Sequence, residues 1–290
     1  MHCRTFACQA LGALAICLFV GLAADAQTLI SHYEFEGNTD NSVAGQPTGT
    51  IVDFNPGNPA SGLGAGAVGS GGLNLNFGDY MGITTAGEPN EAVLHDMTIA
   101  MWIKTAPGLT DGELGNIQIL GTLNDVDSTA LLLGTNGVGN LQLFPRVSTG
   151  GFNRPRLEPG GDVFALERSW ADGEWHHIAI SMTNGATNGD AVGQWYINGQ
   201  PIDTGLSGGG GGIDTSLTFS PWEFELIIGG RNNRGAPDSF LPGGMMLDDI
   251  RVYSGALSAS QVAALVPEPT SLFMLLTSSV GLLGVYRRKN

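Results

Sequence analysis

The chain has 290 residues, of which 27 are acidic and 12 are basic, so its formal net charge is −15 at neutral pH. Two of the acids and four of the bases lie in the two terminal segments, so the part between them has a net charge of about −17. This balance argues against binding to nucleic acid or to anionic lipid, and it favours solubility or association through cations. All three cysteines lie within residues 1–26, so the rest of the chain can have neither disulfides nor thiol chemistry.

The N-terminal residues 1–26 have the pattern of a secretory signal peptide. Arg4 precedes the apolar run Ala10–Ala24, and the small-residue site Ala24-Asp25-Ala26 follows it. We therefore expect cleavage before Gln27 and export of the protein.

Residues 27–265 are expected to form one all-β domain, since about 240 residues are within the range of a single sandwich or barrel. Short runs of alternating apolar and polar residues recur between Gly, Asn, Asp and Pro, and only Ser258–Leu265 has the period of a helix. The expected strands are Leu29–Phe35, Leu73–Ile83, Met97–Lys104, Ile117–Leu123, Ala130–Leu133, Asn140–Phe144, Trp175–Met182, Gln194–Ile197, Gln200–Ile202, Phe224–Ile228 and Gly244–Tyr253.

The strand Gly244–Tyr253 has a carboxylate where a strand should have a core residue. Alternation places Asp248 on the same face as Ile250 and Val252, and Asp249 on the other face. A buried ionised carboxylate loses several kcal/mol of solvation unless a metal or several hydrogen-bond donors compensate. We therefore expect Asp248 to be buried and to have a partner.

An ordered set of segments resembles the laminin G-like domains of the concanavalin A-like lectin and glucanase superfamily. These segments are Tyr33–Asn38 with Asp40, Thr98–Lys104, Trp175–Ile180, Trp195–Gly199, Ile228–Gly230 and Leu247–Leu257. The resemblance implies an antiparallel jelly-roll β-sandwich in which the first and last strands are neighbours. Trp195, in place of an aliphatic residue, and the long insert Arg146–Ser169 depart from the family pattern.

A structural Ca²⁺ is expected where the first strand ends. Ca²⁺ prefers several oxygen ligands, and this segment supplies Glu36, Asn38 and Asp40. An inward Asp248 would meet them if the first and last strands are adjacent, as the resemblance implies, and several relatives bind Ca²⁺ near this place. In the alternative, Asn38 and Asp40 shape a turn through bonds to the backbone, and backbone donors hold Asp248.

The sequence contains no recognisable catalytic set. Laminarinase-type enzymes of this fold carry a motif E-[IL]-D-x-x-E, and the nearest segment, Glu223-Phe-Glu225, has Ile228 where the last acid is required. His176 and His177 are adjacent on a strand, so they point to opposite faces and cannot bind one ion together. We therefore expect a non-catalytic carbohydrate-binding or adhesion module; the alternatives are a glycan-acting hydrolase of the same fold and a passive matrix protein.

Half of the domain's cations lie in the insert Arg146–Ser169. Their guanidinium groups can bind an acidic exopolysaccharide, and we expect Arg154, Arg156 and the neighbouring Trp170 to contact it. In the alternative, the arginines pair with the protein's own carboxylates and the tryptophan belongs to the core.

The C-terminal residues 266–290 contain Pro267-Glu268-Pro269, an apolar run over residues 271–286 and the basic end Arg287–Lys289. This order resembles the PEP-CTERM sorting signal of Gram-negative bacteria, which an exosortase recognises and removes. The apolar run would span about 24 Å as a helix, slightly less than the roughly 30 Å of a bilayer core. The resemblance implies anchorage in the inner membrane before processing, and then a place at the cell surface, on the outer membrane or in the extracellular matrix. An uncleaved anchor is the alternative.

Overall fold

The computed structural model describes residues 27–83, 96–123, 130–135, 139, 141–146, 156–159, 170–183, 192–202, 204–207, 226–233 and 236–267. The expected signal peptide, Glu268, Pro269 and the apolar run after them lie outside the described residues. Within the described part, no helix has the length and apolar character needed to cross a membrane.

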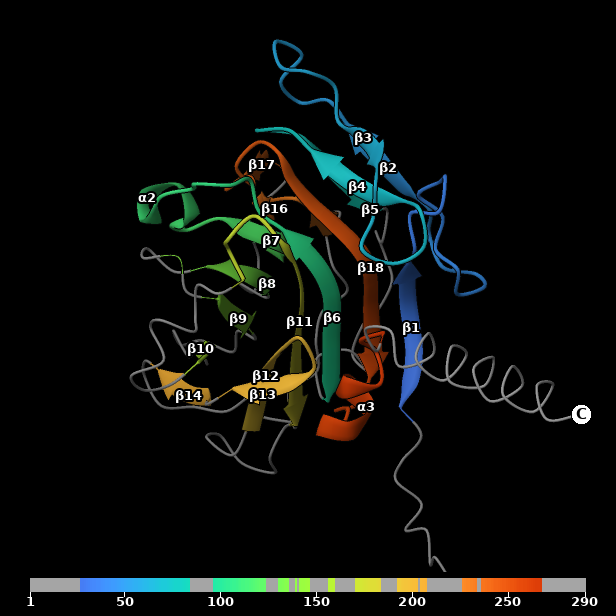
Figure 1. The fold of residues 1–290 in the computed structure, drawn as a ribbon, viewed down its shortest axis with the longest axis vertical. Coiled ribbons are helices and arrows are strands. Elements are labelled where there is room, and N and C mark those ends of the chain that lie inside the picture. The colour runs from blue at the N-terminus through green and yellow to red at the C-terminus, as the bar shows by residue number, and fades with distance from the viewer. Residues whose placement is uncertain are drawn as a thin grey trace, which may run out of the picture.

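Two antiparallel sheets form the body of the domain (Figure 1). The first sheet contains, in spatial order, β13 (Gln200–Ile202), β12 (Val192–Ile197), β11 (Trp175–Thr183), β6 (Met97–Lys104), β18 (Met245–Ser254), β4 (Gly72–Leu75) and β3 (Gly62–Gly64), with β1 (Thr28–Tyr33) paired to β18.

The second sheet contains, in spatial order, β14 (Thr204–Ser207), β10 (Arg156–Pro159), β9 (Leu141–Arg146), β8 (Ala130–Thr135), β7 (Gln118–Leu123), β15 (Leu226–Ile228), β5 (Tyr80–Ile83) and β2 (Gly49–Val52). Two short strands extend it beside β7, namely β16 (Arg231–Asn233) and β17 (Ala236–Asp238). The described helices are α2 (Asp111–Leu114) and α3 (Ala259–Ala263).

Alternating side chains of the two sheets meet in one hydrophobic core. From the first sheet, β6 and β11 contribute Met97, Ile99, Met101, Ile103, Ile178, Ile180 and Met182. From the second sheet come Met81, Ile119, Leu143 and Ile228. The predicted all-β sandwich is therefore confirmed.

Several of the predicted strands agree with the structure, and one does not. β11 pairs with β6 on one side and β12 on the other, and β12 pairs with β13, so three of the expected strands, Trp175–Met182, Gln194–Ile197 and Gln200–Ile202, are consecutive neighbours in the first sheet. The prediction of one strand over Leu73–Ile83 is wrong, because β4 ends at Leu75 and β5 begins at Tyr80 in the other sheet. The turn between them contains Gly78 at a φ of 92°, which glycine adopts without strain.

The expected helix near the C-terminal end of the domain is α3. Ser258 caps it in a reciprocal arrangement with Gln261. The helix covers part of the outer face of the first sheet through a small cluster of Ala100, Ala179, Tyr196, Leu257 and Val262.

Candidate functional site

The last strand, β18, lies inside the first sheet and pairs with β6 along one edge. Its other edge pairs with β4 through Met245–Leu247 and with β1 through Ile250–Ser254, so the expected adjacency of first and last strands is confirmed. Asp248 and Asp249 lie where this edge passes from β4 to β1. The register against β6 shifts between Asp248 and Arg251, and Asp249 has a φ of 49°, so the strand is bulged here and both carboxylates are buried.

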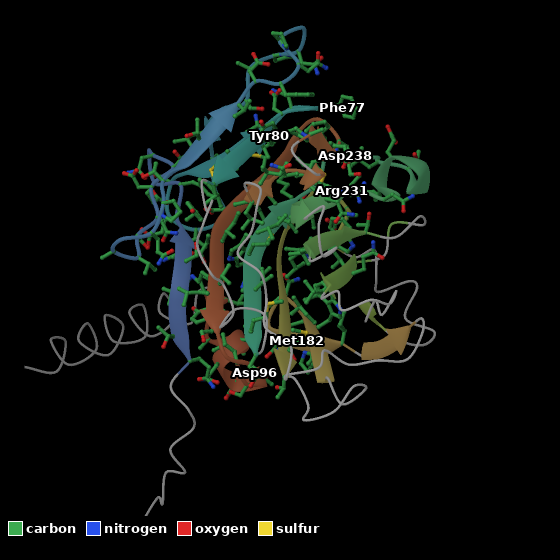
Figure 2. The ribbon with its side chains drawn as sticks, turned by 180° about the vertical axis from the view of Figure 1, so that it is seen from behind. Phe77, Tyr80, Asp96, Met182, Arg231 and Asp238 are labelled. Carbon is green, nitrogen blue, oxygen red and sulfur yellow. The ribbon has the colours of Figure 1, made fainter. Side chains whose placement is uncertain are left out.

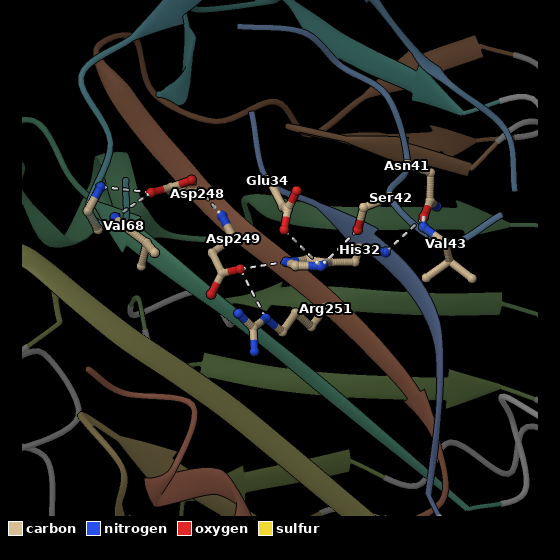
Figure 3. Close-up of polar contacts among 10 residues, drawn as sticks. His32, Glu34, Asn41, Ser42, Val43, Val68, Asp248, Asp249 and Arg251 are labelled. Atoms are coloured by element: carbon tan, nitrogen blue, oxygen red, sulfur yellow. Dashed lines mark hydrogen bonds and ion pairs between the residues drawn. The ribbon is translucent and has the colours of Figure 1, made fainter. Parts of the chain in front are cut away.

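The Asp248 carboxylate is fully buried and accepts three backbone hydrogen bonds (Figure 3). Oδ2 accepts from the N–H groups of Ala67 and Val68, each at 2.8 Å, and Oδ1 accepts from the N–H of Asp249 at 2.7 Å. Loss of solvation outweighs these donors and raises the pKa of Asp248 to about 6. The expected burial of Asp248 is confirmed, and its partners in the structure are backbone groups. The prediction that it shares the face of Ile250 is wrong, because Leu247 and Ile250 both line the core and the bulge between them leaves Asp248 on the other face.

Glu36 binds the other end of the loop that Asp248 holds, residues 65–71. Its carboxylate accepts from the Ser70 N–H at 2.8 Å, the Ser70 hydroxyl at 2.7 Å and the Gly71 N–H at 3.2 Å. A side chain at Gly66 would overlap the Gly71 carbonyl and approach Asp248. The glycines therefore let this loop fold closely enough for two carboxylates to bind its backbone.

The other two predicted metal ligands, Asn38 and Asp40, are exposed. Asn38 Oδ1 accepts from the Asp40 N–H at 2.9 Å, and Asp40 Oδ1 accepts from the Thr48 hydroxyl at 3.0 Å. Among the residues that the structure describes, no group of three or more His, Cys, Asp or Glu side chains is placed to hold a metal ion. The predicted Ca²⁺ ligands do not form a joint ligand set in the structure, and calcium binding stays a prediction.

A buried polar network around Asp249 was not expected from the sequence. Asp249 Oδ1 accepts from His32 Nε2 at 2.6 Å and from Arg251 Nε at 2.9 Å (Figure 3). His32 Nδ1 lies 2.9 Å from the Ser42 hydroxyl and 3.6 Å from Glu34 Oε1. The register of β1 against β18 places His32 opposite Arg251, so the network joins the first strand to the last one.

Ser42, His32 and Asp249 are linked in the order hydroxyl, imidazole, carboxylate, as in the catalytic triad of a hydrolase. Such a triad also needs backbone N–H groups beside the hydroxyl to stabilise an oxyanion. The N–H groups of Ser42 and Val43 already donate to the His32 carbonyl at 2.8 Å and to Asn41 Oδ1 at 3.0 Å. The network therefore fits a structural role better than a catalytic one.

His176 and His177 do point to opposite faces of β11. His177 is buried against Trp102, with ring centroids 5.5 Å apart in an edge-to-face arrangement, and burial lowers its pKa to about 4. His176 contacts Asp172 Oδ1 at 2.9 Å and Asn198 Nδ2 at 3.1 Å. The two rings have separate partners and share no ligand position.

The predicted contacts for an acidic glycan are not assembled in the described part of the chain. Trp170 is fully buried in the core, so it offers no exposed ring to a sugar. Arg156 begins β10, where the structure describes only the backbone, and Arg154 lies outside the described residues.

An aromatic cluster at one end of the sandwich was also missed. Phe54 comes from the β2–β3 connection, Phe77 from the β4–β5 turn, Tyr80 from the start of β5, and Phe240 from the β17–β18 connection. Ring centroids lie 5.4 Å apart for Phe54 and Phe240 and 6.3 Å apart for Tyr80 and Phe240. Phe54 is 51% exposed and Phe77 is 57% exposed. We call these four residues the aromatic end; Figure 2 shows Phe77 and Tyr80 there.

Buried polar groups hold the loops of the aromatic end. The Asp79 carboxylate is buried and accepts from the N–H groups of Phe54 and Asn55 at 3.1 and 3.3 Å. It also accepts from the Ser61 hydroxyl at 2.7 Å. The loop that carries the exposed Phe54 ring is thus fixed at both ends.

Amide and charged groups lie beside the same rings. The Asn58 side chain donates to the Phe77 carbonyl at 2.9 Å. Arg231 and Asp238 form a two-point ion pair at 2.5 and 3.2 Å, and Figure 2 shows them at this end of the molecule. The aromatic end therefore combines exposed apolar rings with a polar surround.

Comparison with known proteins agrees with this fold. The family model described as the concanavalin A-like lectin/glucanases superfamily, of the laminin G type, matches residues 77–263. Domain 4 of AbnA, a GH43 extracellular arabinanase from Geobacillus stearothermophilus solved in complex with arabinotriose, is similar at 20% identity and a TM-score of 0.53. The match covers 83% of this chain and 98% of that domain.

Two toxin domains are similar as well. The binding domain of Paraclostridial Mosquitocidal Protein 1 has 18% identity and a TM-score of 0.54, covering 82% of this chain and 51% of that one. The binding domain of Botulinum neurotoxin serotype G has 12% identity and a TM-score of 0.52, covering 82% and 50%. The chain thus spans about half the length of these toxin domains, and at such identities the likeness is one of fold. No curated protein matches the sequence. The chain belongs to the concanavalin A-like lectin/glucanases superfamily.

Proposed function

We propose that the protein is an exported, non-catalytic glycan-binding or adhesion module of the cell surface or extracellular matrix. The aromatic end is the observation that carries the proposal. Sugars present C–H faces that pack on aromatic rings, and hydroxyl groups that bind nearby amides and charged groups. Phe54 and Phe77 are each more than half exposed, and Asn58, Arg231 and Asp238 lie at the same end of the molecule, so this end supplies both kinds of group (Figure 2).

The rings are also held before any ligand arrives. Asp79 fixes the Phe54 loop through three hydrogen bonds, so little freedom is lost on binding. The likeness to an arabinanase domain solved with arabinotriose supports a glycan as the ligand, and the likeness to binding domains of toxins supports a binding role.

Export and sorting are part of the proposal. The signal pattern of residues 1–26 supports passage across the inner membrane, and Pro267, Glu268 and Pro269 support recognition by an exosortase. The insert with Arg154 and Arg156 is proposed as a further contact for acidic glycans. That contact predicts binding which weakens as salt rises.

A glycan array with the exported protein tests the main proposal. Phe54→Ala combined with Phe77→Ala should reduce binding at least tenfold, whereas Leu63→Ala, which removes another exposed apolar side chain (39% exposed), should leave it unchanged. Incubation with a polysaccharide panel should release no sugars. Sugar release would favour the hydrolase alternative, and absence of binding by the wild type would favour a passive matrix protein.

A further inference from the structure

A pocket of about 550 Å³ lies beside α3, at the other end of the molecule from the aromatic end. In Figure 2 Met182 marks this end, and its neighbours Ser181 and Thr183 line the pocket. Its polar lining side chains include Gln27, Thr183, Gln194, Tyr196, Ser260 and Gln261, and Ala256 and Leu257 add apolar surface. No charged side chain lines it among the residues that the structure describes, although the chain has a net charge of −15.

The rim of this pocket is fixed by hydrogen bonds between amides. Gln261 Nε2 donates to Gln27 Oε1 at 2.8 Å, and Gln27 Nε2 donates to the Ala256 carbonyl at 3.3 Å. Gln261 Oε1 accepts from the N–H and the hydroxyl of Ser258 at 2.8 and 2.9 Å. The cap of α3 thereby orients the amides without a ligand, which lowers the cost of binding one.

Tyr196 gives the pocket an unused hydrogen-bonding group. The residue is only 4% exposed, and it packs in the small cluster with Ala100, Ala179 and Val262. No other residue in the described part of the chain forms a hydrogen bond with its hydroxyl. Because Tyr196 lines the pocket, its hydroxyl is available to bond with a polar ligand there.

We propose that this pocket binds a sugar unit of a neutral glycan. Amide and hydroxyl groups both donate and accept, which suits the hydroxyl groups of a sugar. The absence of cations among the described lining residues disfavours an acidic ligand, and the volume lies within the usual range for small-molecule pockets. The inference rests on the proposed function in taking a glycan as the ligand. It goes further in placing a second site far from the aromatic end.

Titration calorimetry with neutral trisaccharides of arabinose, glucose, galactose and mannose tests the proposal on the exported protein. Tyr196→Phe keeps the ring and removes only the hydroxyl, so affinity for the preferred trisaccharide should fall at least tenfold. Its melting temperature should stay equal to or above that of the wild type, because the hydroxyl is unpaired. Tyr33→Phe is the matched control, since it removes a tyrosine hydroxyl that is bonded to the Pro47 carbonyl away from the pocket; it should leave affinity unchanged.

The variants distinguish binding in the pocket from binding at the aromatic end. Binding that survives the Phe54→Ala and Phe77→Ala changes and is lost in Tyr196→Phe supports the pocket. Undiminished affinity in Tyr196→Phe, with loss in the aromatic variant, overturns the pocket and leaves the proposed function standing. A wild type that binds none of the trisaccharides and nothing on the array overturns the proposed function, and the pocket with it.

Discussion

Replacing Asp248 with alanine tests how much its carboxylate stabilises the folded protein by binding backbone N–H groups of the loop 65–71 and of β18. The change leaves three backbone N–H groups without an acceptor, those of Ala67, Val68 and Asp249. Each buried, unpaired donor costs about 1–3 kcal/mol, so the three together cost about 6 kcal/mol. The variant also escapes the cost of ionising a buried carboxyl group, which for a pKa raised from 3.8 to about 6 is about 3 kcal/mol at neutral pH. The expected net loss at pH 7 is therefore about 3 kcal/mol.

The pH dependence of this loss has a definite sign. Because the folded pKa of Asp248 is above its unfolded value, this group favours folding most in acid, and that contribution is lost as pH rises towards 6. The difference in unfolding free energy between wild type and Asp248→Ala should therefore grow as pH falls from 6.5 to 4. Urea denaturation at several pH values, with equal m-values, measures it.

The control is Glu36→Ala, which removes the exposed carboxylate that binds the same loop. Ser70 is exposed, so solvent can replace Glu36 as the partner of its N–H and hydroxyl, and this variant should lose less stability. A loss of under about 1 kcal/mol for Asp248→Ala, together with no change of that loss between pH 6.5 and 4, would refute the reasoning.

The remaining predictions concern calcium, a buried histidine and processing. If Ca²⁺ binds at Asp248, calcium at a hundredfold excess over its Kd should stabilise the fold by about 2.7 kcal/mol, and Asp248→Asn should abolish this more than Asp249→Asn does; a melting temperature indifferent to calcium and chelator would leave the backbone donors as the sole partners. Because burial lowers the folded pKa of His177 to about 4, the unfolded chain gains a proton first as pH falls below 6.5, and stability drops by about 3 kcal/mol by pH 4. His177→Phe should lose less in urea denaturation over this range; an equal loss would contradict the assignment. In a host with an exosortase, the intact mass of the exported protein should lack Ser271–Asn290, and retention of those residues would indicate a simple anchor.

The bounds of a single strand and the burial of its residues could be predicted from the sequence. The alternation of Met97, Ile99, Met101 and Ile103 gave β6 its correct bounds and its buried face. The burial of Asp248 was also predicted, but its face was not: Leu247 and Ile250 both line the core, because the bulge between Asp248 and Arg251 breaks the alternation and leaves Asp248 on the other face.

Contacts between segments that are distant in the sequence could not be predicted from the sequence. The pairing of His32 with Asp249 joins residues 217 positions apart, and the bulge that turns Asp249 towards His32 has no local signature. Phe77 was placed inside a continuous strand because Leu73, Leu75 and Phe77 alternate with asparagines, and the turn signal Gly78-Asp79 that follows was passed over. Its exposure follows from a change of sheet between β4 and β5 that periodicity alone cannot show.

The place of β18 in the first sheet also sets the order in which the domain can fold. This strand is the last one synthesised, yet it lies between β6 on one edge and both β4 and β1 on the other. Before it emerges, β1 has no strand partner among the described strands, and the two halves of the first sheet have nothing to join them. Contacts that close such long loops form slowly, since the loss of chain entropy comes first. A nascent chain shorter than about 245 residues should therefore remain open.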